Sequence, residues 1–307
     1  MPTAQIPGKA EGPRIPWILT YPPCREYFPV MELTGRQPQG DVLAKALEEN
    51  LWNLWRRFGL GYGCKLHEDP DCLYFDTPIS NLPYNAVMRF RAPEEEADAR
   101  IDAIFKHYQK RGVPFLWLIH PSAEPADLDQ RLMKRGFVEL ENCPGMTMDL
   151  ADLPDNTREV PPTIHIREAT TEDDLEAIYD LIAWRWEVPS EARALLPEVS
   201  SSFDVTKPGS GLRCWIAWMF TEPVSKVVLN VHEGVAGIYG VATKPEVRGL
   251  GLARSMTLMA FQAAREAGCS LGVLHSSMKA ERLYEKIGFR RCGPPFRIFA
   301  KPGSFHM

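Results

Sequence analysis

The residues with the clearest chemical potential form a glycine-rich loop. An apolar stretch over residues 235–242 predicts a strand, and Arg248, Gly249, Gly251 and Ala253 follow it, just before a predicted helix. Glycine permits positive φ and lets another group approach the main chain closely. The first turn of the next helix offers free N–H groups beside the positive end of its dipole. This pattern is typical of a phosphate-binding loop, and a ligand that carries a pyrophosphate would suit it.

Two motifs, taken together, resemble those of the GCN5-related N-acetyltransferase (GNAT) family. The family's loop signature, Arg or Gln, two residues, Gly, one residue, then Gly or Ala, is met by Arg248, Gly251 and Ala253. Its later signature is Asn-x-x-Ala-x-x-Leu-Tyr followed by Gly-Phe. The residues in those places are Ser277, Ala280, Leu283, Tyr284, Gly288 and Phe289, with Ser277 in place of the usual Asn. The resemblance covers about residues 163–300.

The resemblance implies acetyl-CoA or another acyl-CoA as the co-substrate. It places the pyrophosphate on the loop and the pantetheine arm along the preceding strand, with further contacts after the next strand. The cofactor-binding residues expected on this basis are Val241, Ala242, Thr243, Arg248, Gly249, Leu250, Gly251, Leu252, Ala253, Ser277 and Lys279. More ordinary interpretations exist for each motif, because glycines also mark simple strand-to-helix turns.

The resemblance also implies roles for catalytic groups in acyl transfer. The Val241 N–H is the candidate oxyanion donor. Tyr284 is the candidate general acid, since a phenol and a thiol have comparable reference pKa values. The general base is open. Glu233, expected on the same strand face and acting through a water, is one candidate; His232 is an alternative, and Tyr239 is expected near the acceptor.

The function expected is transfer of an acetyl or other short acyl group from acyl-CoA to an amine of a small molecule or peptide. One alternative is acyl transfer from a carrier-protein thioester, or to a hydroxyl, in specialised metabolism, so a carrier protein is a possible partner. Another is a CoA-binding module that does not turn the thioester over. The retained Tyr284 favours an enzyme, because a binding module needs no acid for a thiolate.

Composition narrows the remaining possibilities. The chain has 307 residues, 45% of them hydrophobic and 24% charged, which suits two globular domains. A net charge of −5 predicts no general attraction to nucleic acid or an anionic membrane. The N-terminal residues lack the features of a signal peptide and no run is long enough to span a membrane, so a cytoplasmic location is the expectation.

The cysteines do not predict a disulfide framework or a metal site. There are seven, scattered and without a Cys-x-x-Cys pair, so reduced thiols are expected. One segment does concentrate possible ligands, at Cys64, His67, Asp69, Asp71 and Cys72. Its spacing fits no standard zinc pattern, and a turn-rich loop is the interpretation that follows. No metal is therefore expected.

The chain contains an internal repeat. Leu132 to Phe137 aligns with Tyr284 to Phe289, each after an apolar strand and a short helix, but the earlier copy has Leu132 in the tyrosine's place and no glycine loop. The fold class expected is α/β (α+β), with two GNAT-like domains, each a mixed, mostly antiparallel twisted sheet flanked by helices. The predicted divisions are an irregular Pro-rich arm (1–40), a degenerate domain without a CoA site (41–155, the first half), a linker (156–162) and a catalytic domain (163–307, the second half).

Overall fold

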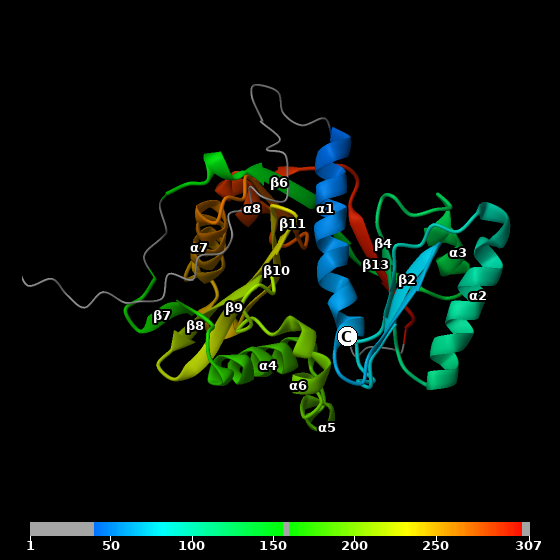
Figure 1. Cartoon of the computed structure of the whole chain (residues 1–307), viewed down its shortest axis with the longest axis horizontal. Coiled ribbons are helices and arrows are strands. Elements are labelled where there is room, and N and C mark those ends of the chain that lie inside the picture. Colours follow the sequence, from blue (N-terminus) through cyan, green and yellow to red (C-terminus); the bar gives the residue numbers. More distant parts are fainter. Residues whose placement is uncertain (1–39, 156–159, 303–307) are drawn as a thin grey trace, which may run out of the picture.

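The computed structural model describes residues 40–155 and 160–302, which form two mixed β-sheets with helices packed on their faces (Figure 1). The predicted Pro-rich arm therefore lies outside the described residues, apart from its last position, and so does most of the predicted linker. The first sheet contains β1 (Lys65–Asp69), β2 (Cys72–Asp76), β3 (Ala86–Met88), β4 (Leu116–Ile119), β5 (Val138–Cys143) and β13 (Phe296–Ala300). The second contains β6 (Gly145–Asp149), β7 (Ile164–Glu168), β8 (Leu212–Met219), β9 (Glu222–His232), β10 (Val235–Thr243), β11 (Leu271–His275) and β12 (Arg290–Arg291).

The longer helices begin and end close to where the sequence pattern places them. They are α1 (Gly40–Trp55), α2 (Glu94–Arg111), α3 (Leu128–Lys134), α4 (Glu172–Trp186), α7 (Leu252–Glu266) and α8 (Glu281–Ile287). Two short helices, α5 (Ser190–Arg193) and α6 (Leu196–Val199), lie between α4 and β8. Local signals account for several ends. Thr171 and Asp174 form a capping box at the start of α4, and Gly112 ends α2 with φ +66°.

Each sheet contains one strand from the other half of the chain. The first sheet has the order β1-β2-β3-β4-β13-β5, so β13 from the end of the chain lies between β4 and β5. The second has the order β7-β8-β9-β10-β11-β6-β12, so β6 from the first half lies between β11 and β12. Both exchanged strands run antiparallel to both neighbours. In each sheet, a parallel pair of strands (β3 and β4, or β10 and β11) is therefore followed by an antiparallel strand from the other half.

This exchange modifies the predicted domain limits. Residues 41–155 were expected to contain one whole sheet, but β6 belongs to the second sheet and β13 to the first. The physical reason is that an apolar strand pairs wherever an open ladder and an apolar face are available. Met146 and Met148 on β6 are buried in the core of the second half, and Phe296 and Ala300 on β13 are buried in that of the first.

Helix α1 lies between the two sheets (Figure 1). Its Leu51 and Trp52 are buried against the first sheet, whose opposite face carries α2 and α3. Its Asn50 faces the second sheet, where the side-chain amide donates to the Val235 carbonyl at 2.9 Å. The approach is so close that a Cβ at Gly237 would lie 2.0 Å from Asn50 Oδ1. Glycine at that position is what allows the helix to reach the sheet.

The segment from Cys64 to Cys72 is not the turn-rich loop that its spacing predicted. It forms β1 and the start of β2, an antiparallel hairpin in which His67 pairs directly with Tyr74. The prediction was wrong because β1 has little apolar alternation, and its place is set by backbone pairing with the buried β2. None of the helices in the described ranges is long and apolar enough to cross a membrane.

Candidate active site

A wedge opens between β10 and β11, the only parallel neighbours in the second sheet. Their pairing runs from Val235 with Leu271 to Ile238 with Leu274. Beyond that point β10 continues to Thr243, while β11 ends at His275. The final residues of β10 therefore have no partner strand on this side among the described residues. The carboxyl ends of parallel strands are the usual place for a ligand in mixed and parallel sheets.

The predicted glycine loop follows directly from this wedge. Gly249 has φ +80° and Gly251 has φ +85°, values that L side chains rarely adopt. Gly251 is the N-cap of α7, and no side chain caps that end. The first turn of α7 also contains no acidic residue. Because the leading N–H groups of a helix have no partner within it, this end can receive an anion.

The corresponding place in the first half is built differently. There, α2 follows β3, the strand that pairs in parallel with β4. Pro93 is its N-cap, and Glu94, Glu95 and Glu96 occupy its first turn. Three carboxylates at a helix N-terminus satisfy the dipole and repel phosphate. The first half therefore lacks a place for a CoA pyrophosphate at the position where the second half has one.

Tyr284 lies on α8, directly after the wedge, and is 5% exposed. It belongs to the same apolar cluster as Leu252 of the loop, and Val241 packs against that cluster. Burial raises the pKa of Tyr284 to about 12, so the phenol is protonated at neutral pH. Three of the residues predicted from sequence, Val241, Leu252 and Tyr284, thus belong to or pack against one apolar cluster.

A β-bulge surrounds Val241. The pairing of β10 with β9 shifts register between Tyr239 and Ala242, and Gly240 within the bulge has φ +56°. Lys226 on β9 extends its buried side chain to this point, and its Nζ donates to the Gly240 carbonyl at 2.9 Å. Burial lowers the pKa of Lys226, and the nearby Arg185 lowers it further while Cys214 opposes them. Bulges commonly redirect a strand beside an active site.

Lys226 was not predicted from the sequence. It lies between Ser225 and Val227, and a lysine in such a strand could equally have been an exposed residue at an edge. The available signal was the apolar run that follows it, Val227 to Leu229, because a lysine in a buried strand needs a partner for its side chain.

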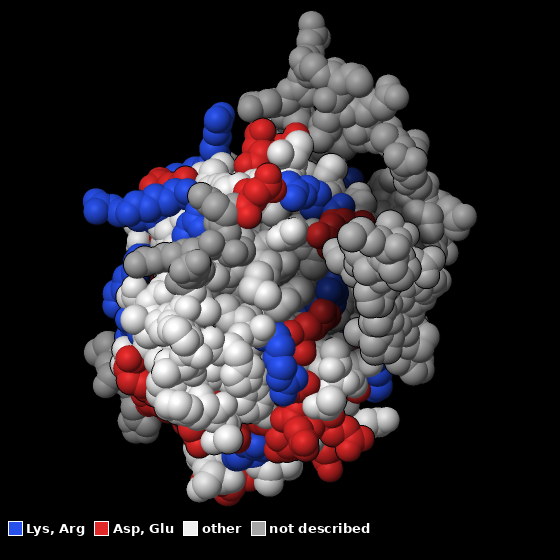
Figure 2. Space-filling model, turned by 90° about the vertical axis from the view of Figure 1, so that its left-hand side faces the viewer, with Lys and Arg blue, Asp and Glu red and all other residues white. Residues whose placement is uncertain are grey.

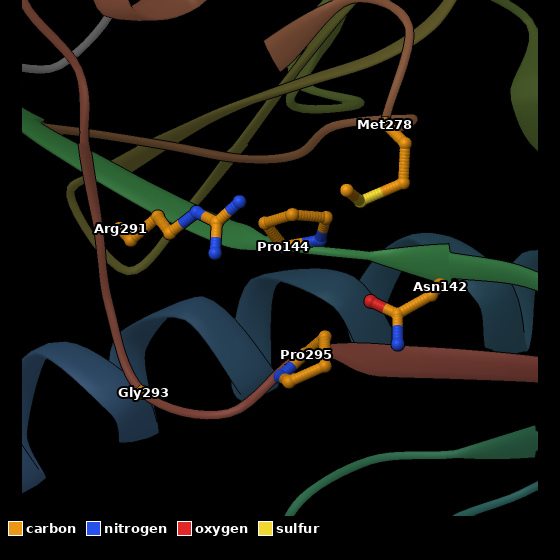
Figure 3. Close-up of a pocket in the computed structure, with 6 residues that line it drawn as sticks. All are labelled: Asn142, Pro144, Met278, Arg291, Gly293 and Pro295. Atoms are coloured by element: carbon orange, nitrogen blue, oxygen red, sulfur yellow. The ribbon is translucent and has the colours of Figure 1, made fainter.

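The loop after β11 contributes the remaining predicted cofactor residues. Ser277 is partly buried and Lys279 is exposed, and both precede α8. Between them, Met278 points into a cavity of about 420 Å³ (Figure 3). The cavity lies where the chain passes from β5 to β6 and from β12 to β13. Its lining residues are Asn142, Pro144, Met278, Arg291, Gly293 and Pro295.

The structure does not support the predicted base. Glu233 is not on the strand: β10 begins at Val235, and Glu233 is exposed in the preceding turn with φ +50°. At the usual rise of a strand it is about 25 Å along the chain from Val241. Glu233 was read as part of the strand, but Glu233-Gly234 forms a two-residue hairpin turn between β9 and β10. Both residues have the positive φ that such a turn needs. His232 pairs with Val235 beside the same turn and is equally distant.

Tyr239 is also placed differently from the expectation. It was predicted near the acceptor, but its hydroxyl donates to Asn50 Oδ1 at 2.9 Å. Its ring packs against the core of the first half. Asn230 Nδ2 lies 3.2 Å from Asn53 Oδ1 in the same contact. Tyr239 therefore joins the two halves and is not available to a substrate.

Charge on the outer face of the second half is mixed. Figure 2 shows lysine and arginine interspersed with aspartate and glutamate over this face, with acidic side chains gathered toward its lower edge. Near the loop, the Arg248 side chain donates from Nε to the carbonyl of Thr243, the last residue of β10, at 3.1 Å.

Comparisons with known proteins agree with this architecture. Residues 175–289 match the family model described as acetyltransferase (GNAT) family. A GCN5-related N-acetyltransferase from Kribbella flavida superposes with a TM-score of 0.62 at 18% identity, covering 85% of this chain and 96% of that one. One from Sphaerobacter thermophilus gives a TM-score of 0.55 at 18% identity, covering 87% and 94%.

A tandem GNAT protein from the clavulanic acid biosynthesis pathway, without AcCoA, gives a TM-score of 0.54 at 11% identity, covering 85% of this chain and 94% of that one. Identities this low show the fold alone. No curated protein matches the chain.

The second sheet thus has a wedge between parallel strands and a glycine loop after it. Residues 175–289 match the GNAT family model, and the two sheets give the chain the fold of a tandem GNAT protein. A fold of this kind supports acyl transfer generally.

Proposed function

We propose that the second half is an N-acyltransferase that moves a short acyl group from acyl-CoA to an amine. The observation that carries this proposal is the wedge beyond Ile238, which is followed in the chain by a short 3-10 helix (Pro245–Val247), the glycine loop and the uncapped N-terminus of α7. A pantetheine arm is a chain of amides, so it needs exposed backbone groups of the kind that the end of β10 offers. The pyrophosphate at its end needs the glycine loop.

The chemistry follows from where the groups lie. The Val241 N–H, in the bulge, supports the thioester carbonyl as it becomes an oxyanion. The neutral amine attacks the carbonyl carbon, the carbon–sulfur bond breaks, and Tyr284 gives its proton to the sulfur. The proton that the amine nitrogen loses passes to water, and the tyrosinate takes a proton back from water. Lys226 acts as a positioning residue: by holding the Gly240 carbonyl it fixes the direction of the next N–H. Ser277 and Lys279 would contact the CoA beside the loop.

The acceptor is proposed to enter through the cavity at Met278. This cavity adjoins the loop that carries Ser277 and Lys279, and it combines apolar walls with two polar side chains, Asn142 and Arg291. Arg291 is paired with Glu281, its Nη2 lying 2.6 Å from Oε2, so the pair brings little net charge. A small amine with an apolar body would fit these walls. Donor chemistry other than free acyl-CoA, such as a carrier-protein thioester, would use the same wedge.

The test is calorimetric titration with acetyl-CoA, together with an assay for thiol release in the presence of candidate amines. Gly251→Asp should abolish binding, because it places bulk and negative charge against the phosphates. Gly209→Asp is the matched control: Gly209 also has positive φ (+76°) and open surroundings, but it lies in the loop before β8. If acetyl-, propionyl- and malonyl-CoA all give no heat with the unaltered protein, the proposed function is wrong.

A further inference from the structure

A cluster of metal-binding side chains lies on the first sheet, away from the proposed active site. His67 on β1, Asp76 on β2 and His107 on α2 each direct a ligand atom to one point, and these atoms all lie within 4.8 Å of one another. The two Asp76 carboxylate oxygens lie 2.9 Å (Oδ1) and 3.0 Å (Oδ2) from His107 Nε2, and Oδ2 lies 2.9 Å from His67 Nε2. Nothing in the acyl-transfer proposal uses these groups.

We propose that His67, Asp76 and His107 form a binding site for one divalent transition-metal ion, with Zn²⁺ as the best-suited species. Two imidazoles and a carboxylate are a usual protein ligand set for zinc, which leaves a fourth position for water. At normal bond lengths, adjacent ligand atoms around a tetrahedral zinc lie about 3.3 Å apart. The observed nitrogen–oxygen separations are a few tenths of an ångström shorter, so small side-chain shifts would admit the ion.

The neighbouring arginine fits this arrangement. Arg111 Nη1 lies 2.9 Å from Asp76 Oδ1, while its other contacts hold it in place: Nη1 donates to Asn85 Oδ1 and Nη2 to the Thr77 carbonyl. Oδ1 of the carboxylate therefore contacts both Arg111 and His107, and Oδ2 faces both histidines. A metal-ligating carboxylate is commonly hydrogen-bonded in this way through its second oxygen.

Packing fixes the two imidazole rings before any ion binds. His67 stacks face to face on Tyr74, with ring centroids 4.2 Å apart and planes at 3°. His107 meets the same tyrosine edge-on at 5.6 Å. The side chains of His67, Asp76 and His107 are 15%, 13% and 31% exposed, so the site is enclosed yet reachable from solvent. A bound ion would link α2 to the β1–β2 hairpin at the edge of the sheet.

The experiment is titration of the untagged full-length protein, first freed of metal with a chelator, with Zn²⁺ alone and with Co²⁺ alone. We expect one ion per chain with micromolar or tighter affinity, and for Co²⁺ the intense visible absorption of a tetrahedral site. His107→Gln and His67→Gln should each weaken binding by at least about tenfold, since each removes one of three protein ligands. His165→Gln, an exposed histidine of the second half, is the matched control and should change nothing.

Circular dichroism and urea unfolding show whether each variant is folded, independently of the metal. His107 is on the outer part of a helix, so its variant should keep the fold even if the His67 variant does not. Zinc binding of equal affinity in wild type and His107→Gln would overturn the proposal. So would a Co²⁺ spectrum that stays that of the hydrated ion. Neither result depends on whether the second half is an acyltransferase.

Discussion

Separating the two halves should unfold the second one, because β6 is not part of it. A fragment of residues 160–307 would lack the strand that lies between β11 and β12, and with it the buried side chains of Met146, Met148 and Leu150. Burying one such side chain is worth about 1.5–3 kcal/mol, so the three contribute about 5–9 kcal/mol. That approaches the whole stability of an ordinary domain, about 5–15 kcal/mol, before the lost backbone pairing is counted.

The assay compares three samples by size-exclusion chromatography, urea unfolding followed by circular dichroism, and acetyl-CoA titration. The samples are residues 160–307 alone, the same fragment produced together with residues 1–155, and the full chain cut at a protease site placed within 156–159. We expect no cooperative unfolding from the fragment alone. The co-produced pair and the cut chain should both be folded, because the break leaves β6 and β13 on fragments that can still exchange them.

A fragment of residues 160–307 that is monomeric, unfolds cooperatively and binds acetyl-CoA would refute this reasoning. A cut chain whose pieces separate at once without denaturant would also contradict it, since each piece holds an interior strand of the other's sheet.

Three further results are expected. Tyr284→Phe should lower turnover by about tenfold to a thousandfold with unchanged acyl-CoA affinity, while Tyr62→Phe on the surface should do neither; unchanged turnover would remove Tyr284 from the mechanism. Lys226→Met should lower turnover by up to about a hundredfold by releasing the bulge, again without loss of acyl-CoA affinity. Burial, together with the nearby His120, lowers the pKa of His275 to about 3, so the native state keeps it neutral while the unfolded chain protonates it near pH 6.5. Stability should therefore fall as pH drops from about 6.5 toward 3, and His275→Asn should flatten that slope by up to about 1.4 kcal/mol per pH unit in urea unfolding at several pH values; an unaltered slope would contradict the assignment.

Much of the fold could be predicted because its elements have strong local signals. The helix over Glu94–Arg111 has apolar spacing and a glycine at its end, and the strand Leu271–His275 is continuous and apolar. The strand Lys65–Asp69 could not be predicted, since three of its five positions are charged and pairing with β2 supplies the order. Which sheet a strand joins is likewise not visible locally, because nothing in the residues of β6 or β13 states that they change places.

In the candidate site too, residues marked by a local motif could be predicted, and residues placed by distant contacts could not. Gly249, Gly251 and Tyr284 carry motif signals, and the structure brings the loop and the tyrosine to one apolar cluster. Glu233 was misplaced because it was read as part of the strand, whereas Glu233 and Gly234 form the hairpin turn before β10. Tyr239 was misassigned because its partner, Asn50, is far away in the chain. Contacts between distant segments depend on the packing of α1 against both sheets, which no local pattern encodes.

The exchanged strands also fix an order of events during synthesis. A first domain usually folds while the rest of a chain is still being made. Here the first sheet keeps a gap between β4 and β5 until Phe296–Ala300 has left the ribosome, so β13 pairs with these two strands only after the second half has been made. The first half therefore stays incomplete until the second half has been synthesised. During this interval the unpaired edges of β4 and β5 can pair with other chains, so we expect the protein to depend on chaperones then.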